Sequence, residues 1–163
     1  MTDRDPASLA RTAVAALRRA GRRGVLARGW AALAGASDDE DLVVVDEVPH
    51  DWLFSRMAAV VHHGGAGTTH TGLRAGIPNV VVPFFTDQPF WAGRVADLDV
   101  GPTPIPRRTL TVERLAAAIH AAVSDPALGA RAAALGRRIQ AEDGVTRAVQ
   151  AVQHQLALAQ QAL

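Results

Sequence analysis

Residues 60–69 read VVHHGGAGTT, and the fold of the chain is most readily deduced from this stretch. Its apolar residues predict a buried strand over 58–62, its glycines a loop over 64–67, and its threonines the start of a helix over 68–75. Glycine lets the backbone come close to a ligand, and a helix N-terminus offers unpaired N–H groups and a partial positive charge. The stretch therefore predicts a metal-free site for a diphosphate.

Two better-known phosphate motifs are excluded. A Walker loop requires a lysine, and the chain has 17 arginines but no lysine. The dinucleotide motif G-x-G-x-x-G does not fit either, because the order here is G-G-A-G-T-T. One alternative stays open, a tight strand-to-helix turn that His62 and Thr68 merely cap. His62 itself either supports His63 or points into the sheet.

Helices and short apolar strands alternate on both sides of this stretch. Further strands are expected at 24–27, 42–46 and 79–82, and helices at 7–20, 50–56 and 87–97. Three more helices are expected to close the chain. Thr111 is the expected N-cap of the first and Ser124 or Asp125 that of the second, and Gly144 separates the second from the third. This alternation predicts an α/β fold, a Rossmann-like doubly wound parallel sheet with ligands at the carboxyl ends of its strands. The strand that normally opens such a unit is missing, because a helix comes first.

Several apolar positions are expected to form the core. The run Val43-Val44-Val45 predicts a strand buried on both faces, as in parallel sheets. Helical spacing places Phe90, Val95 and Leu98 on the inner side of their helix. Trp52 and Phe54 are expected to pack their short helix against the sheet.

Composition narrows the class of protein. The chain has 163 residues, which suits one domain, and 48% of them are apolar, a normal globular share. A net charge of +1 gives no electrostatic footprint for nucleic acid, and the lack of cysteine excludes disulfides and thiolate chemistry. The charged N-terminus has no apolar core of a signal peptide, so a cytoplasmic protein is expected.

The region from Val48 to Val100 resembles the signature region of the UDP-glycosyltransferase superfamily, in particular its sterol glucosyltransferase and bacterial antibiotic glycosyltransferase branch. The resemblance rests on several motifs in order: VPHDWLF at 48–54, HHGGAGTT at 62–69, FFTDQPFW at 84–91 and TLT at 109–111. It covers residues 1–125 closely and the tail loosely.

Members of this superfamily have the GT-B fold, in which two Rossmann-like domains face each other across a cleft. The resemblance implies that residues 1–163 form the C-terminal domain, which binds the nucleotide sugar. It also implies that the helix over 143–163 crosses to an N-terminal, acceptor-binding domain that this chain does not include. Leu156, Leu158 and Leu163 are therefore expected to be exposed.

The resemblance also implies roles for single residues of the donor site. His63 is expected to donate to the diphosphate, and backbone N–H groups or a hydroxyl are expected from four residues that follow it: Gly65, Ala66, Gly67 and Thr68. Asp87 and Gln88 match the pair that hydrogen-bonds the sugar hydroxyls, and Asp87 is equally well placed to cap its helix.

The nucleoside end of the donor is expected near four further residues, Trp30, Val48, Pro49 and His50. Trp30 also fits an ordinary core position, and Trp91 faces either the cleft or the core. The general base is not expected in this chain.

The implied reaction is an inverting transfer of a hexose from a UDP-sugar (UDP-glucose or a related donor) or a dTDP-sugar to a hydroxyl of a lipid, sterol-like or natural-product acceptor. No metal or other cofactor is expected. Contact with a membrane is expected only through a lipid acceptor. The chain alone is expected to bind the donor and to transfer little. A non-catalytic nucleotide-sugar-binding module, or one subunit of a split transferase, has the same features. A nucleotide-sugar epimerase or hydrolase, or a purely structural domain, is a weaker alternative.

Overall fold

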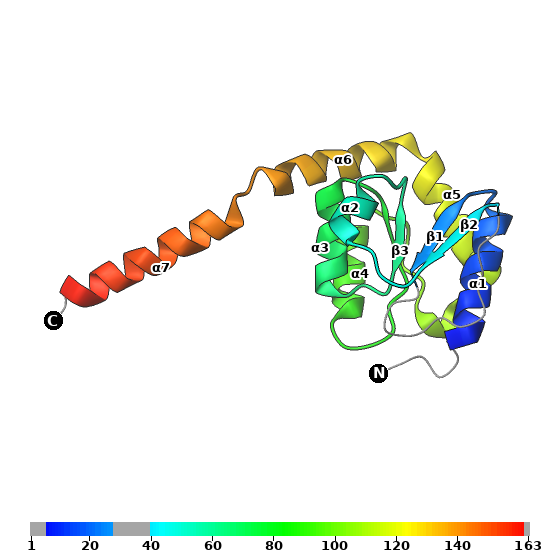
Figure 1. Cartoon of the computed structure of the whole chain (residues 1–163), viewed down its shortest axis with the longest axis horizontal. Helices are drawn as coiled ribbons and strands as arrows, with labels where there is room; N and C mark the ends of the chain where they lie inside the picture. Colours follow the sequence, from blue (N-terminus) through cyan, green and yellow to red (C-terminus); the bar gives the residue numbers. More distant parts are fainter. Residues whose placement is uncertain (1–5, 28–39, 162–163) are drawn as a thin grey trace.

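The computed structural model describes residues 6–27 and 40–161, which form an α/β domain with one long helix projecting from it (Figure 1). The strands are β1 (Gly24–Ala27), β2 (Leu42–Val45), β3 (Val60–His62) and β4 (Asn79–Val81). The helices are α1 (Pro6–Arg19), α2 (His50–Phe54), α3 (Ala66–Ala75), α4 (Gln88–Asp97), α5 (Val112–Ser124), α6 (Pro126–Gln140) and α7 (Gly144–Gln161), with a short 3-10 helix η2 (Arg107–Thr109) before α5.

The four strands form two parallel pairs instead of the single sheet that was expected. β1 pairs with β2, with Gly24 opposite Leu42, and β3 pairs with β4, with His62 opposite Val81. Within the described residues no ladder joins the two pairs. The predicted parallel direction is confirmed for both.

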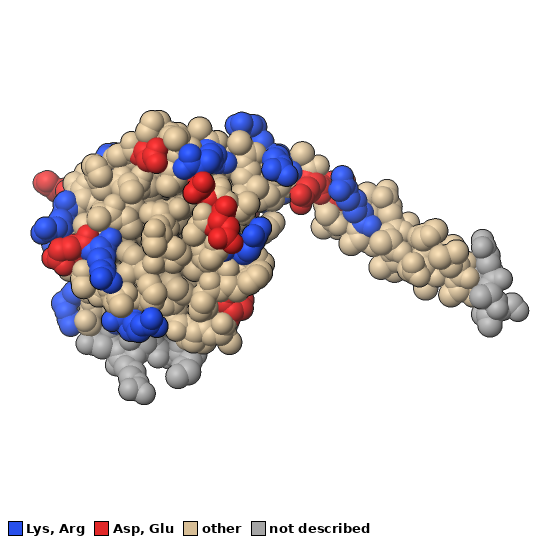
Figure 2. All heavy atoms as spheres, turned by 180° about the vertical axis from the view of Figure 1, so that it is seen from behind, with Lys and Arg blue, Asp and Glu red and all other residues tan. Residues whose placement is uncertain are grey.

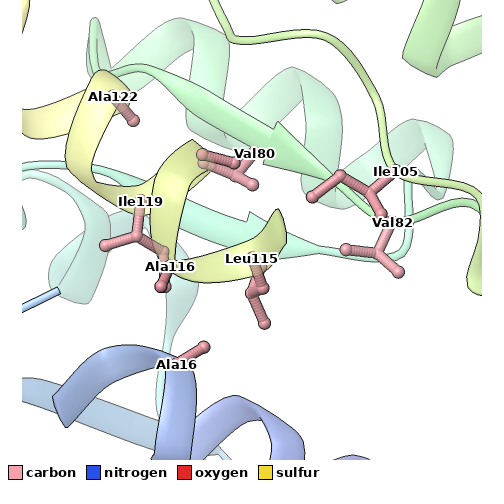
Figure 3. Packing of buried hydrophobic residues seen from close by; sticks show 9 residues of the cluster. Ala16, Val80, Val82, Ile105, Leu115, Ala116, Ile119 and Ala122 are labelled. Atoms are coloured by element: carbon pink, nitrogen blue, oxygen red, sulfur yellow. The ribbon is translucent and has the colours of Figure 1, made fainter. Parts of the chain in front are cut away.

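Strand β4 has helices on both of its faces. Val80 and Val82 point into a core cluster with Ala16 of α1 and the buried face of α5 (Figure 3). Val81 points the other way, into a second cluster with Val95 of α4 and the buried face of α6. Consecutive strand residues face opposite sides, so these two clusters are the two faces of a doubly wound sheet. The predicted fold class is confirmed.

Two predicted helix caps are present. Thr111 Oγ1 accepts a hydrogen bond from Arg114 N–H at 3.2 Å and begins α5. Asp125, and not Ser124, caps α6: its carboxylate accepts from Ala127 N–H at 2.9 Å and Leu128 N–H at 3.3 Å. These bonds pair N–H groups that the first turn of a helix leaves without partners.

Several expectations about burial are wrong. Val43 is 52% exposed, so β2 is covered on one face only within the described residues. On α4, Val95 is buried as expected, but Phe90 is 61% and Leu98 38% exposed, because the buried face runs through Ala92 and Val95. Phe54 is buried as expected, but Trp52 lies on the surface, where the guanidinium of Arg56 covers its ring at 4.3 Å.

Helix α7 projects from the domain (Figure 1). Its large apolar side chains are exposed. Leu156 and Leu158 are exposed as expected, and Leu163 lies outside the described residues. Figure 2 shows charged side chains scattered over the domain and around the start of α7, but none along its outer part. No helix in the described part of the chain is long and apolar enough to span a membrane.

The packing of α6 against α3 leads to the first prediction. A Cβ added at Gly136 of α6 would lie 2.6 Å from the Cα of Gly76, which ends α3 with a left-handed φ of 74°. Because the obstacle is backbone, Gly136→Ala is expected to push the helices apart and lower the free energy of unfolding by about 1–3 kcal/mol. Urea denaturation measures this change.

Gly129→Ala is the matched control on the same helix. A Cβ at Gly129 meets nothing within 4 Å, so helix propensity alone acts there. Alanine at this position is expected to raise stability by up to about 1 kcal/mol. Equal effects of the two substitutions would contradict the close packing of α3 and α6.

Candidate functional site

The loops after β3 and β4 come together at one edge of the fold, because the two strands are parallel. Gly64 is the point of contact. Its φ of +90° suits glycine, and a Cβ there would lie 2.8 Å from Val81 Cγ1 and 3.1 Å from the carbonyl oxygen of Gln88. The predicted diphosphate loop and the predicted sugar-binding pair are therefore neighbours in space.

His62 holds this loop in place. Its Nδ1 accepts a hydrogen bond from Gly64 N–H at 3.0 Å, so Nε2 carries the proton and donates to Asn79 Oδ1 at 2.9 Å. Asn79 is fully buried and donates in turn to the carbonyl oxygen of Ile77 at 2.8 Å. Of the two roles left open for His62, the structure thus shows the one directed into the sheet.

The imidazole of His62 is neutral in this arrangement. The pKa of His62 is lowered from 6.5 to about 4, mainly by burial; the Asn79 hydrogen bond opposes this shift, and the nearby His63 and His50 add to it. Protonation of Nδ1 would remove the acceptor that Gly64 uses. The conformation of the glycine loop therefore depends on an uncharged His62.

The start of α3 presents free hydrogen-bond donors. The helix begins at Ala66, two residues earlier than expected, and its N-cap is Gly65, which has no side chain to cap it. The N–H groups of the first turn, those of Ala66, Gly67 and Thr68, donate to no other described residue. The first turn also lacks an acidic residue. The positive end of the helix dipole is therefore not neutralised locally.

The two threonines of the motif differ. Thr69 is buried, and its hydroxyl donates to the carbonyl oxygen of Gly65 at 2.9 Å. The Thr68 hydroxyl makes no hydrogen bond with the described residues. Neither Thr68 nor His62 caps α3. The alternative interpretation, in which these two side chains cap a purely structural turn, therefore does not describe this helix start.

His63 is exposed beside this helix start. A Cβ added at Gly65 would lie 2.6 Å from His63 Nε2, so the imidazole lies directly against the Gly65 backbone. Any larger residue at position 65 would displace the ring. Glycine here keeps His63 next to the free N–H groups of α3.

Asp87 and Gln88 lie across from this loop at the start of α4. Gln88 is buried, and its Oε1 accepts from Phe84 N–H at 2.8 Å and Phe85 N–H at 3.2 Å, which shapes the β4–α4 loop. Asp87 is exposed and makes no capping hydrogen bond. Its Oδ2 accepts instead from Trp91 Nε1 at 2.9 Å. Of the polar side-chain atoms of this pair, Asp87 Oδ1 and Gln88 Nε2 make no hydrogen bond with the described residues.

The expected base-binding segment lies beside the loop. Pro49 is the N-cap of α2, and its carbonyl oxygen accepts from Leu53 N–H at 3.0 Å, while Val48 is half-buried. His50 is exposed and stacks on Phe54 with ring centroids 4.8 Å apart. Helix α2 packs against α3, which puts this segment next to the glycine loop.

Trp30 lies outside the described residues. Within them, no three His, Cys, Asp or Glu side chains gather as a metal site would require. The expectation that no metal or cofactor is needed stays a prediction.

Two side-chain contacts of the site were not anticipated. Asn79 is the partner of His62, and its one signal in the sequence is an amide at the start of an otherwise apolar strand. Trp91 holds Asp87, and its signal is the four-residue spacing that places both on one side of a helix.

Known proteins are similar to this chain in sequence and in fold. Residues 35–154 match the profile of the family described as "Erythromycin biosynthesis protein CIII-like, C-terminal domain". The chain belongs to this family. It is 45% identical over 148 residues to the sterol 3-beta-glucosyltransferase UGT80A2 of Arabidopsis thaliana, and 45% identical over 146 residues to the vancomycin aglycone glucosyltransferase of Amycolatopsis orientalis.

Solved structures agree. The glycosyltransferase of kitacinnamycin matches 95% of this chain with a TM-score of 0.81 and 30% identity. The glycosyltransferase VinC, solved in complex with DTDP, matches 73% of it with a TM-score of 0.61 and 27% identity. The resemblance to GT-B glycosyltransferases, and to the C-terminal half of that fold, is confirmed.

The family match covers only part of each relative. The matched regions are 90% of this chain but 23% of the Arabidopsis enzyme, and 88% of this chain but 35% of the Amycolatopsis enzyme. In the structures, the match spans 40% of the kitacinnamycin enzyme and 31% of VinC.

The buried His62 gives a pH-dependent prediction. Since its pKa is lowered from 6.5 to about 4 in the folded state, the unfolded state binds more protons between these values. The stabilising contribution is complete above pH 6.5 and falls by about 3 kcal/mol as the pH is lowered to 4. Urea denaturation at several pH values measures this loss.

His62→Gln is the control, because a glutamine does not titrate. The difference in unfolding free energy between the original chain and the variant is expected to shrink as the pH falls through this window. Two curves that stay parallel from pH 7 to 4 would contradict the neutral, buried His62.

Proposed function

We propose that this chain is the donor-binding domain of an inverting glycosyltransferase and binds a UDP-sugar or dTDP-sugar at the edge formed by the loops after β3 and β4. The observation that carries the proposal is the contact of Gly64 with Gln88 and Val81. This contact places two features in one site. They are the uncapped N-terminus of α3, which can bind two phosphates, and the Asp87 carboxylate, which suits sugar hydroxyls.

The diphosphate lies, in this proposal, over the first turn of α3. The N–H groups of Ala66, Gly67 and Thr68 point out of the helix and have no partner among the described residues. His63 lies beside Gly65 and adds a donor of its own. Hydrogen bonds to charged groups contribute about 1.5–3 kcal/mol each, so a few of them are sufficient to hold a nucleotide.

The sugar lies toward α4. Asp87 has one carboxylate oxygen fixed by Trp91, which leaves Oδ1 to accept from sugar hydroxyls. The Oε1 of Gln88 is used by the loop backbone, so this residue offers a donor through Nε2 and not an acceptor. The pair therefore suits hydroxyls that donate to Asp87 and accept from Gln88.

The nucleoside lies along Val48, Pro49 and His50, next to the glycine loop. The complex of VinC with DTDP supports a nucleoside diphosphate as the ligand, and the names of the plant and bacterial relatives support glucose as the sugar. We propose UDP-glucose as the first donor to test.

During transfer, the acceptor hydroxyl attacks the anomeric carbon while the nucleoside diphosphate leaves. Negative charge grows on the diphosphate, and the α3 N–H groups with His63 stabilise it without a metal. The acceptor and the general base belong to a partner domain, toward which α7 presents its apolar side chains. A cytoplasmic location, and membrane contact only through a lipid acceptor, complete the proposal.

His63→Ala tests the diphosphate site. Loss of one charge-assisted hydrogen bond is expected to weaken UDP binding by about ten- to a hundredfold, as measured by isothermal titration calorimetry. His70→Ala is the control, since His70 is an exposed residue of the same helix. An unchanged affinity of the His63 variant, or no UDP binding by the original chain at millimolar concentration, would refute the proposed site.

Trp91→Phe tests the sugar site. The substitution keeps an aromatic ring but removes the hydrogen bond to Asp87, so the carboxylate loses its fixed orientation. Binding of UDP-glucose is expected to weaken by about three- to tenfold, and binding of UDP to stay the same. Equal loss for both ligands, or for neither, would show that Asp87 does not contact the sugar.

A transfer assay with a separately expressed acceptor domain distinguishes an enzyme half from a non-catalytic binding module. Activity of the mixture supports a split or divided transferase. Donor binding without transfer by the mixture supports the module.

A further inference from the structure

Thr86 has a backbone conformation that threonine rarely adopts. Its φ is +56°, and among the described non-glycine residues only Asp99 also has a positive φ. Asp99 lies just beyond the end of α4, and aspartate tolerates this conformation better than most residues do. Thr86 is β-branched, so its side chain is crowded against the backbone at this φ. The surrounding loop must therefore hold Thr86 in place.

Hydrogen bonds fix the chain on both sides of Thr86. Gln88 N–H donates to the carbonyl oxygen of Phe85 at 3.3 Å, which closes a four-residue turn over 85–88. Asp87, the third residue of this turn, has φ −82° and ψ −8°. Together with the positive φ of Thr86, these angles fit a type II′ turn, whose second residue is usually glycine. The Oε1 of Gln88 adds two more bonds, because it accepts from the N–H groups of Phe84 and Phe85.

The turn itself does not require a threonine. Glycine would adopt the same backbone conformation without crowding. Thr86 is exposed, and its hydroxyl makes no hydrogen bond with the described residues, so the side chain does not stabilise the loop through such a bond. Backbone strain of this kind is concentrated at binding and active sites. We therefore looked for a role of the Thr86 side chain outside the fold.

The position of Thr86 in the chain indicates such a role, because it directly precedes the two residues proposed to hold the sugar. Asp87 Oδ1 is available as an acceptor, and Gln88 Nε2 is available as a donor. The hydroxyl of Thr86 can both donate and accept. Three consecutive residues thus each present one polar side-chain group that makes no hydrogen bond with the described part of the chain.

We propose that Thr86 is a specificity-determining residue of the donor site, and that its hydroxyl forms a hydrogen bond with one hydroxyl of the bound hexose. This contact rests on the proposed function and adds a third sugar contact to those of Asp87 and Gln88. A site that hydrogen-bonds a substrate hydroxyl rejects an analogue without it, because a polar group of the site is then left unpaired. Thr86 consequently selects against donor sugars that are deoxygenated at the position it contacts.

Thr86→Val and Thr86→Ser separate the hydroxyl from the shape of the side chain. Valine keeps the branched shape but has no hydroxyl, so binding of UDP-glucose is expected to weaken about three- to tenfold, as measured by isothermal titration calorimetry, while binding of UDP stays the same. Serine keeps the hydroxyl, so UDP-glucose is expected to bind within about twofold of the original affinity. Thr146→Val, on the projecting helix α7, is the control and is expected to change neither affinity (Figure 1).

UDP-glucose analogues that each lack one sugar hydroxyl identify the contact. In the original chain, each hydroxyl that the site binds makes the corresponding analogue bind more weakly than UDP-glucose. One of these losses is expected to disappear in Thr86→Val, because the partner of that hydroxyl is already gone. If Thr86 had a structural role only, Thr86→Val would leave every one of these losses in place, and that result would overturn the proposal.

Thr86→Gly tests whether the turn alone matters. Glycine suits a φ of +56° and keeps the loop, so binding of UDP-glucose is expected to weaken as in Thr86→Val. Unchanged binding of UDP-glucose by both variants, or an equal loss of UDP binding, overturns the role of Thr86. The diphosphate site stands in either case if UDP binds to the original chain and His63→Ala weakens this binding. If the original chain does not bind UDP, the proposed function and the role of Thr86 fail together.

Discussion

The close approach of Gly64 to Val81 and Gln88 is the contact on which the geometry of the site depends. A side chain at this position is opposed twice, by the left-handed φ of +90° and by atoms within 3.1 Å of where a Cβ would stand. The parallel register of β3 and β4 brings the loops to the same edge, but only glycine lets them touch. As a result the N-termini of α3 and α4 face one small region instead of two separate ones.

The two adjacent histidines, His62 and His63, have different roles at this contact. Successive strand residues point to opposite sides, so His62 turns into the sheet while His63 emerges at the end of β3. His62 is bonded at both ring nitrogens and stays neutral, since burial lowers its pKa and Gly64 uses its Nδ1. It therefore fixes the backbone, and His63 remains free to meet an anion. The buried amide of Asn79 completes this arrangement, because otherwise an acceptor for Nε2 would be lacking in the interior.

Features that depend on a few consecutive residues were predictable from the sequence. The caps at Thr111 and Asp125 follow from local chemistry, and the strand–glycine–helix order of residues 60–69 follows from hydrophobicity and backbone freedom. Features that depend on distant residues were not. Nothing near Phe90 shows that α4 buries Ala92 and exposes Phe90 instead, and nothing near His62 reveals a partner 17 residues away. The start of α3 was predicted two residues too late, because its N-cap, Gly65, has no capping side chain that would mark the start in the sequence.

The site also shows why backbone and side chains contribute differently to it. N–H groups at a helix start are held by the fold, so they bind any phosphate that reaches them and discriminate little between nucleosides or sugars. A carboxylate such as Asp87 depends on its own identity and on the neighbour that orients it, here Trp91. In the proposed site, changes at Asp87, Gln88 and Trp91 are therefore expected to alter which sugar is bound, while binding of the diphosphate persists. A fold with this division can keep one chemistry and vary the sugar, provided that the sheet supporting both loops stays intact.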